Sequence, residues 1–149
     1  MRALAVVCDK TGLQFSAVDS GGAVIEESDI EVPVSHTDRG AQLGWLLDEA
    51  GALLQRLKPD VVYLRKAGSG KFTAAPERHE VEAVVQIAAH RKGIACELRG
   101  TEQIRASHVP KAKGAYDELL KLPEVAARSN AAKRERYLYA VTALKDHGG

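Results

Sequence analysis

The first third of the chain holds three short apolar segments separated by turns, and this order restricts the fold more than any other feature of the sequence. The segments cover residues 2–8, 13–18 and 23–32, and the turns between them are Lys10-Thr11-Gly12 and Asp19-Ser20-Gly21-Gly22. Strands joined by such short connections are antiparallel neighbours, because a parallel connection needs a crossover of about a dozen residues or more. We therefore expect three antiparallel strands at the start of the domain.

The remaining sequence alternates between helical and strand patterns. Apolar residues between positions 38 and 57 recur at the i, i+3, i+4, i+7 spacing of an amphipathic helix, which Lys58-Pro59 ends. Pro76 fits the first turn of a second helix that ends near Gly93. The further predicted elements are strands at 61–64 and 94–98, a short helix from Thr101, and helices at 111–121 and 131–145. This order predicts an α/β fold in which a mixed five-stranded sheet, with three antiparallel strands first and parallel crossovers after them, is flanked by helices.

Length and composition are those of one globular domain. With 149 residues, of which 45% are hydrophobic, the chain can bury a core without disulfides, so we expect a single domain over residues 1–149. No apolar run approaches the roughly 20 residues of a membrane span, and the N-terminus lacks a secretory signal pattern. The two cysteines, Cys8 and Cys96, are not spaced as zinc ligands and suit a reducing compartment. The expected location is the cytoplasm, with no membrane partner.

Charge is distributed unevenly along the chain. Residues 1–60 contain five Lys/Arg and ten Asp/Glu, a net charge of −5, whereas residues 61–149 contain sixteen and ten, a net charge of +6. A basic half can attract polyanions through the release of counterions. The same distribution is also that of an ordinary solvated surface, so both interpretations stay open.

Three sequence segments together resemble a known family. They are Val7-Cys8-Asp9-Lys10-Thr11-Gly12, the turn after Leu64, and Leu119-Leu120-Lys121-Leu122-Pro123 ahead of a final helix that contains Tyr139-Ala140-Val141-Thr142-Ala143. In their order and placement the chain resembles the bacterial Holliday-junction resolvases of the ribonuclease H-like superfamily, and an uncharacterised bacterial family with the same core. The resemblance implies a ribonuclease H-like fold. In active members it implies two-metal cleavage of phosphodiesters by carboxylates from strand one, strand four and the last helix.

The resemblance places Asp9 at the first metal position, but the second falls on Arg65. A shift of one residue brings Leu64 or Lys66 to that position, and neither is acidic. A cation in such a cluster repels a divalent metal ion. We therefore expect no metal ligand set, no cofactor and no catalysis, with Asp9 paired to Arg65 or to Arg136.

The last helix leaves two alignments open. The preferred one puts Lys133 and Arg136 where the family has acids, and a shift of one residue puts Glu135 there instead. The second alignment leaves an alternative hypothesis open, in which Asp9 and Glu135 are catalytic residues of an active Mg²⁺-dependent, structure-specific endonuclease.

The cations at these positions predict a groove for DNA or RNA. The predicted nucleic-acid-binding residues are Arg65, Lys66, Lys71, Lys133 and Arg136. The turn Gly68-Ser69-Gly70-Lys71 lacks the first glycine and the final Ser or Thr of a phosphate-binding loop, so it does not predict nucleotide hydrolysis. The leading hypothesis is a degenerate resolvase-like domain that binds nucleic acid or a nucleic-acid-associated partner. A structural or protein-interaction domain, as a homodimer through helix 38–57 around Trp45, is the third possibility.

Overall fold

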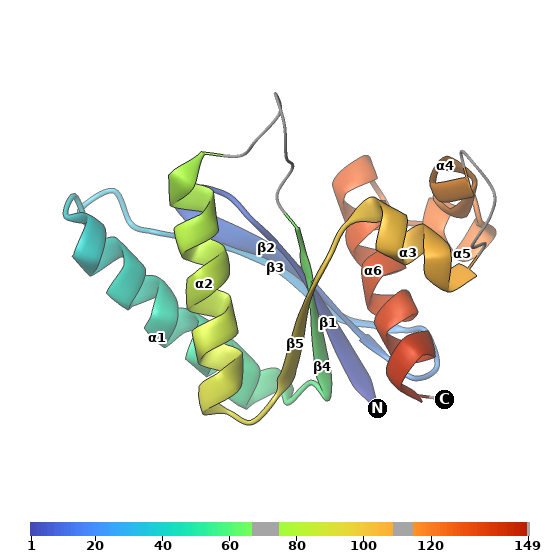
Figure 1. Cartoon of the computed structure of the whole chain (residues 1–149), viewed down its shortest axis with the longest axis horizontal. Helices are drawn as coiled ribbons and strands as arrows, with labels where there is room; N and C mark the ends of the chain where they lie inside the picture. The colour runs from blue at the N-terminus through green and yellow to red at the C-terminus, as the bar shows by residue number, and fades with distance from the viewer. Residues whose placement is uncertain (67–74, 109–114, 149) are drawn as a thin grey trace.

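A central five-stranded sheet lies between two layers of helices in the computed structural model of the chain, which describes residues 1–66, 75–108 and 115–148 (Figure 1). The strands are β1 (Arg2–Cys8), β2 (Gly12–Asp19), β3 (Val24–Glu31), β4 (Val61–Arg65) and β5 (Ala95–Arg99). Their order across the sheet is β3-β2-β1-β4-β5. β1, β2 and β3 pair antiparallel, and β4 pairs parallel with both β1 and β5. The predicted mixed sheet is confirmed.

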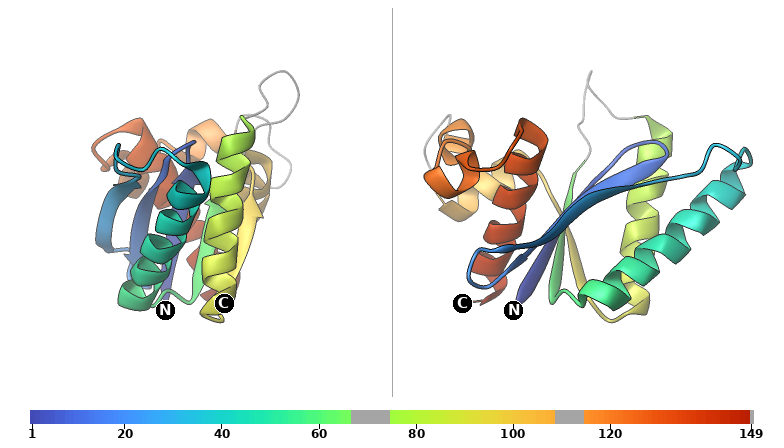
Figure 2. Two further views of the ribbon diagram at one scale, coloured as in Figure 1. Left: turned by 90° about the vertical axis from the view of Figure 1, so that its left-hand side faces the viewer. Right: turned by 180° about the vertical axis from the view of Figure 1, so that it is seen from behind.

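Helices cover both faces of this sheet (Figures 1 and 2). One face is covered by α1 (Arg39–Leu57) and α2 (Pro76–Arg91). The other is covered by α6 (Ala131–Gly148), beside which lie α3 (Thr101–His108), α4 (Ala115–Leu119) and α5 (Pro123–Ala126). No helix among the described residues is long and apolar enough to cross a bilayer.

Local signals explain where α1 begins and ends and where α5 begins. The Asp38 carboxylate accepts a hydrogen bond of 2.9 Å from the Ala41 N–H and so caps α1, and Lys58 ends that helix in the left-handed conformation.

One predicted helix needs correction. The helix expected at 111–121 ends at Leu119 as α4, with 111–114 outside the described residues, and the separate helix α5 was not predicted. Pro123 begins α5 because proline has no N–H to continue a preceding helix but fits a first turn.

Alternate residues of the central strands face two separate cores. In β1, Leu4 and Val6 pack with α1 and α2, whereas Ala3 and Ala5 pack with α6. Because side chains alternate along a strand, Val7 lies on the α6 face as well. A site between the sheet and α6 therefore lies at the carboxyl end of β1, on the α6 face.

Both cysteines have free thiols. Burial raises the pKa of the Cys8 thiol well above its usual range, and burial raises the pKa of Cys96 to about 11. Such thiols stay protonated and pack as small apolar side chains.

Candidate functional site

The register of the two central strands defines which residues meet at their carboxyl ends. Val6 of β1 pairs with Leu64 of β4, so the next residues along the parallel strands are Val7 and Arg65. On the other side of β1, Val7 pairs with Gln14 of β2. The residue of β1 beside Arg65 is thus apolar, and Asp9 lies beyond the end of the strand.

Arg65 makes an ion pair with Glu135 of α6. The Arg65 Nε lies 2.9 Å from Glu135 Oε1, and the Tyr116 hydroxyl donates a hydrogen bond of 2.7 Å to Glu135 Oε2. Both oxygens of this carboxylate are therefore engaged within the chain. The Arg65 side chain is 34% exposed and that of Glu135 is 20% exposed, so the pair is only partly reached by solvent. We call Arg65, Glu135 and Tyr116 the arginine–glutamate–tyrosine cluster.

A second tyrosine lies next to this cluster. Tyr139 follows Glu135 by one turn of α6 and is 2% exposed. Its hydroxyl is close to Arg65 and Tyr116 but makes no hydrogen bond with any described residue. The pKa of Tyr139 is raised to about 12, first by burial and then by the Glu135 carboxylate. Burial, followed by the hydrogen bond to Glu135, also raises the pKa of Tyr116. Both phenols therefore stay protonated at neutral pH.

The two cations predicted from α6 are engaged within the chain as well. Arg136 is 5% exposed, and its Nε and Nη1 donate to Ser16 Oγ at 3.1 Å and Gln14 Oε1 at 3.3 Å. Lys133 Nζ lies 3.6 Å from Glu27 Oε1. Arg136 is thus shielded from solvent, whereas the Lys133 side chain is 36% exposed and is paired with Glu27.

Asp9 belongs to the turn between β1 and β2. Its Oδ1 accepts a hydrogen bond of 2.9 Å from the Thr11 N–H, and the Thr11 hydroxyl donates to Glu31 Oε2 at the same distance. Partial burial raises the pKa of Glu31, and the nearby Asp9 carboxylate raises it further, although the Thr11 hydrogen bond opposes this. Asp9 makes no ion pair with Arg65 or with Arg136, so the predicted pairing is wrong. The physical reason is that the hydrogen bond within the turn directs the Asp9 side chain toward β3.

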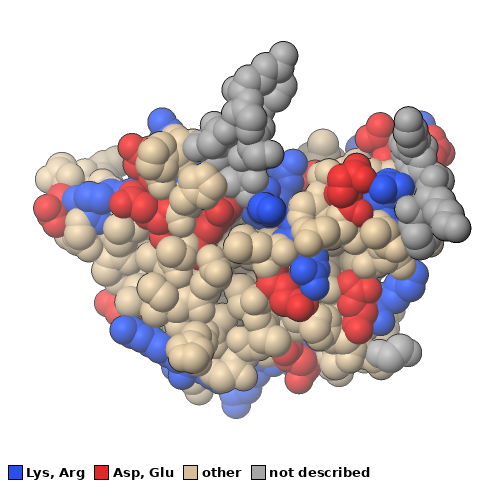
Figure 3. All heavy atoms as spheres, in the orientation of Figure 1, with Lys and Arg blue, Asp and Glu red and all other residues tan. Residues whose placement is uncertain are grey.

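Of the five predicted cations, four lie in the described part of the chain, and of these Lys133 and Arg136 line one groove together without Arg65 and Lys66. Lys66 is exposed and donates its backbone N–H to the Arg99 carbonyl at 2.9 Å. Lys71 and its glycine-bearing turn lie outside the described residues. On the face seen in Figure 3, basic and acidic side chains are interspersed over the described surface. The structure brings Arg65 to Glu135, as the second alignment of the last helix implied, and it turns Arg136 toward β2.

The arginine–glutamate–tyrosine cluster does not fit Mg²⁺, which needs carboxylate oxygens free to bind it. The one carboxylate at this point already accepts from a guanidinium and a phenol, and the guanidinium charge repels a divalent ion. Within residues 1–66, 75–108 and 115–148, no three His, Cys, Asp or Glu side chains gather as a metal ligand set.

Several residues of this site were missed from the sequence. Gln14 and Ser16 interrupt the apolar strand at alternate positions, so strand periodicity could have placed both on one face. Tyr116 and Tyr139 gave no comparable signal, because their role depends on how α4 and α6 are rotated against the sheet.

Comparison with known proteins was informative only at the level of structure. No protein-family model matches the sequence, and no curated protein matches it. RuvC from Thermus thermophilus is similar to this chain with a TM-score of 0.73 and 15% sequence identity, over 97% of this chain and 94% of RuvC. T. thermophilus RuvC in complex with Holliday junction substrate gives a TM-score of 0.72 and 16% identity, over 100% and 96% of the two chains.

A more distant similarity is to the yeast mitochondrial Holliday junction resolvase Ydc2. The TM-score is 0.54 at 10% identity, over 96% of this chain and 78% of that one. At sequence identities this low, the structural similarity establishes the fold and leaves the activity open. The chain thus has the ribonuclease H-like fold of the Holliday junction resolvases, as its sequence resemblance implied.

Proposed function

We propose that this chain is a catalytically degenerate resolvase-like domain that binds nucleic acid without cleaving it. The observation that carries the proposal is the arginine–glutamate–tyrosine cluster at the carboxyl end of β4. A two-metal nuclease needs several converging carboxylates at such a strand end, and here a guanidinium fills the position. The fold similarity to a resolvase solved with its junction substrate supports nucleic acid as the class of ligand.

Few phosphate contacts are available to this domain. Lys66 is exposed, Arg65 and Lys133 are partly exposed but each is paired with a carboxylate, and Arg136 is buried. Affinity for a duplex falls with salt in proportion to the number of phosphates neutralised. The proposal therefore implies modest affinity and a shallow salt dependence.

We expect four-way-junction DNA to bind with an affinity that falls about 25-fold between 50 and 300 mM salt, as two phosphate contacts would give. Fluorescence anisotropy with junction, duplex and single-stranded probes measures this. Lys66→Gln should lower the slope of log affinity against log salt concentration by the value for about one phosphate contact.

Incubation of the same junction with Mg²⁺ or Mn²⁺ should leave it uncut. Cleavage that is lost in Asp9→Asn would instead establish the endonuclease alternative.

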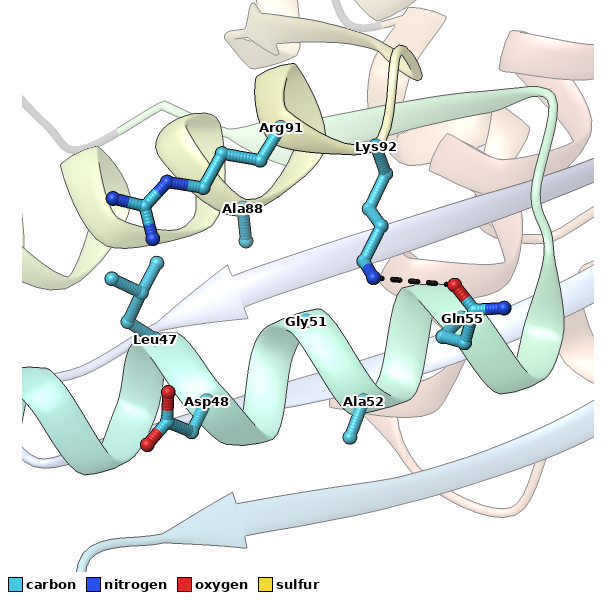
Figure 4. A pocket seen from close by; sticks show the side chains of 8 residues that line it. All are labelled: Leu47, Asp48, Gly51, Ala52, Gln55, Ala88, Arg91 and Lys92. Carbon is cyan, nitrogen blue, oxygen red and sulfur yellow. Dashed lines mark hydrogen bonds between the residues drawn. The ribbon is translucent and has the colours of Figure 1, made fainter.

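A groove on the outer side of α1 and α2 supports a second proposal, that the chain forms a homodimer. The groove has a volume of about 400 Å³, and Figure 4 shows Gly51 of α1 opposite Ala88 of α2, with Lys92 donating to Gln55 at one end. A Cβ added at Gly44 or Gly51 would meet nothing within 4 Å. Each glycine costs a helix roughly 1 kcal/mol relative to alanine. No contact with the described residues requires either of them.

The charges along this groove suit a second copy of the chain. Asp48 of α1 and Arg91 of α2 both line it, and neither makes an ion pair with any described residue. A two-fold contact across this groove would set Asp48 of one copy opposite Arg91 of its partner, and Arg91 of the first opposite Asp48 of the second. We propose that α1 of a second copy occupies the groove. Trp45 is not its anchor, because it packs against the core beside His36.

Replacing Gly44 and Gly51 with glutamine should separate the dimer and also stabilise each subunit. Light scattering after gel filtration should give about twice 16.0 kDa for the natural chain and 16.0 kDa for the double variant. Urea unfolding should show the variant subunit more stable by about 1 kcal/mol, because glutamine is the better helix former. A natural chain that stays at 16.0 kDa at high concentration would exclude this dimer.

A further inference from the structure

The outer side of β3 is an open edge of the sheet. β3 is the first strand in the sheet order, so β2 is its only neighbouring strand in the described part of the chain, and the left view of Figure 2 shows β3 at the margin of the sheet. An edge strand presents backbone N–H and C=O groups that can pair with another extended chain. The register of β3 against β2 tells which of its residues present them.

Three residues of β3 direct their backbone groups away from β2. The Val32 N–H donates to the Thr11 carbonyl at 2.9 Å, which makes these two residues a hydrogen-bonded pair of the antiparallel ladder. Hydrogen-bonded pairs alternate with pairs that make no hydrogen bond across the ladder. The residues that bond to β2 are therefore Glu26, Ser28 and Ile30. The outward-pointing N–H and C=O groups belong to Glu27, Asp29 and Glu31.

Two grooves meet along this edge. One, of about 330 Å³, lies between β3 and the start of α6, and the other, of about 190 Å³, lies between β3 and α1. Ser28 and Asp29 line both of them. Because side chains alternate between the two faces of a sheet, an added strand would place its side chains in one groove and in the other by turns. Backbone pairing with recesses for alternate side chains is how proteins bind a peptide as an added strand.

The charges along the edge favour a basic strand. β3 contains no Lys or Arg, and its four acidic residues are Glu26, Glu27, Asp29 and Glu31. Cations of the flanking helices reach two of them, since Arg56 of α1 pairs with Glu26 and Lys133 of α6 lies 3.6 Å from Glu27 Oε1. Asp29, and Glu49 on the α1 side of the edge, make no ion pair or hydrogen bond with any described residue. These two carboxylates are therefore available to cations from outside the chain.

A second copy of β3 does not suit this edge. Two copies paired antiparallel about Ser28 would set Glu27 of each opposite Asp29 of the other, and like charges directly opposite each other destabilise a sheet. Charged side chains on an edge strand prevent such self-association. The same charges attract a strand of the opposite sign.

We propose that the open edge of β3 binds an extended basic segment of a partner protein, which joins the sheet as an additional strand. Its backbone pairs with Glu27, Asp29 and Glu31, and its Lys or Arg side chains lie beside Asp29 and Glu49. This role goes beyond nucleic-acid binding and does not depend on it, because β2 and β1 separate β3 from β4, at whose end Arg65 lies.

The probe is a fluorescein-labelled peptide with blocked ends, Thr-Lys-Val-Lys-Lys-Val-Lys, which has lysines on both faces when extended. It should bind the natural chain in fluorescence anisotropy, and a version with Gln for every Lys should bind at least about 10-fold more weakly. Methylating the backbone nitrogens of either the odd or the even residues removes N–H groups from one side of the peptide only. One of these two peptides should bind at least about 10-fold more weakly than the other, because it loses the hydrogen bonds to β3.

Asp29→Pro tests the same edge from the protein. Proline at this position removes an outward-pointing N–H, so the ladder to β2 stays complete, and edge strands tolerate proline there. Asp29→Asn is the matched control, because it removes the same charge and keeps the N–H. Asp29→Asn should weaken peptide binding about 2- to 5-fold, and Asp29→Pro at least about 10-fold, while circular dichroism shows that both variants stay folded.

Amide hydrogen exchange, measured for each residue by NMR, needs no substitution. In the free chain the outward-pointing N–H groups of β3 should exchange quickly and those bonded to β2 slowly, and saturating peptide should slow the first set. Equal affinity for the two methylated peptides, equal affinity for the Gln version, or no binding by any of them would overturn the proposal. Slow exchange of the outward-pointing groups in the free chain at high concentration would assign the edge to a second copy and overturn it as well.

Discussion

Replacing Arg65 with glutamate should give the protein a response to divalent metal ions that the natural chain lacks. The substitution removes the cation from the arginine–glutamate–tyrosine cluster and sets a second carboxylate beside Glu135. Two neighbouring carboxylates repel each other and favour a divalent ion between them. Without metal, we expect the variant to be less stable by about 2 kcal/mol, because Glu135 loses its partner in a partly buried place.

Thermal unfolding with and without Mn²⁺ measures the effect. At a concentration of metal tenfold above its dissociation constant, binding should stabilise Arg65→Glu by about 1.4 kcal/mol, which corresponds to a rise of about 3 to 6 °C in Tm. Arg65→Gln is the control, since it removes the same cation without adding an acid, and its Tm should not change with Mn²⁺. An equal metal response in the natural chain would contradict the view that a guanidinium stands in the metal position.

Replacing Arg136 with methionine should make the protein more stable, by about 1–3 kcal/mol, even though two hydrogen bonds are lost. Arg136 is a buried cation whose hydrogen bonds reach only Ser16 and Gln14. Methionine has a similar reach and no charge to desolvate, while the Ser16 hydroxyl keeps Glu27 as an acceptor.

Urea unfolding of Arg136→Met and of Arg136→Lys tests whether the buried charge or the hydrogen bonds of this side chain decide its effect on stability. If the charge itself is the cost, the lysine variant should be no more stable than the natural chain, whereas the methionine variant should be. A loss of more than about 1 kcal/mol in Arg136→Met would show that the hydrogen bonds to β2 outweigh the desolvation of the guanidinium.

The sheet could be predicted because its signals are local. The turn Lys10-Thr11-Gly12 fixes the first hairpin, and Pro76 fixes the start of α2, each through residues that are adjacent in the sequence. The helix α5, which Pro123 begins, was missed between the helices expected at 111–121 and 131–145, because its four residues are too few to show a helical period.

The site could be predicted only in part. Arg65 was recognised as a cation at the end of β4, but its partner depends on the rotation of α6, which the packing of Leu138 and Tyr139 against the sheet sets. Asp9 was expected to pair with Arg65 or with Arg136, yet the hydrogen bond from the Thr11 N–H holds it in the turn. The pairing of Arg65 is decided by contacts between residues far apart in the sequence, which no periodicity encodes, whereas the position of Asp9 is decided within its own turn.

The parallel pairing of β1 with β4 has a consequence for how this chain is made. Ala3 pairs with Val61, so β1 has no partner on that side until β2, β3 and α1 have all been synthesised. Contacts of such high sequence separation slow folding, because the entropy of closing the intervening loop must be overcome first. On the ribosome, the nascent hairpin therefore carries one uncovered central edge until β4 emerges, and that interval is when this chain most needs a chaperone.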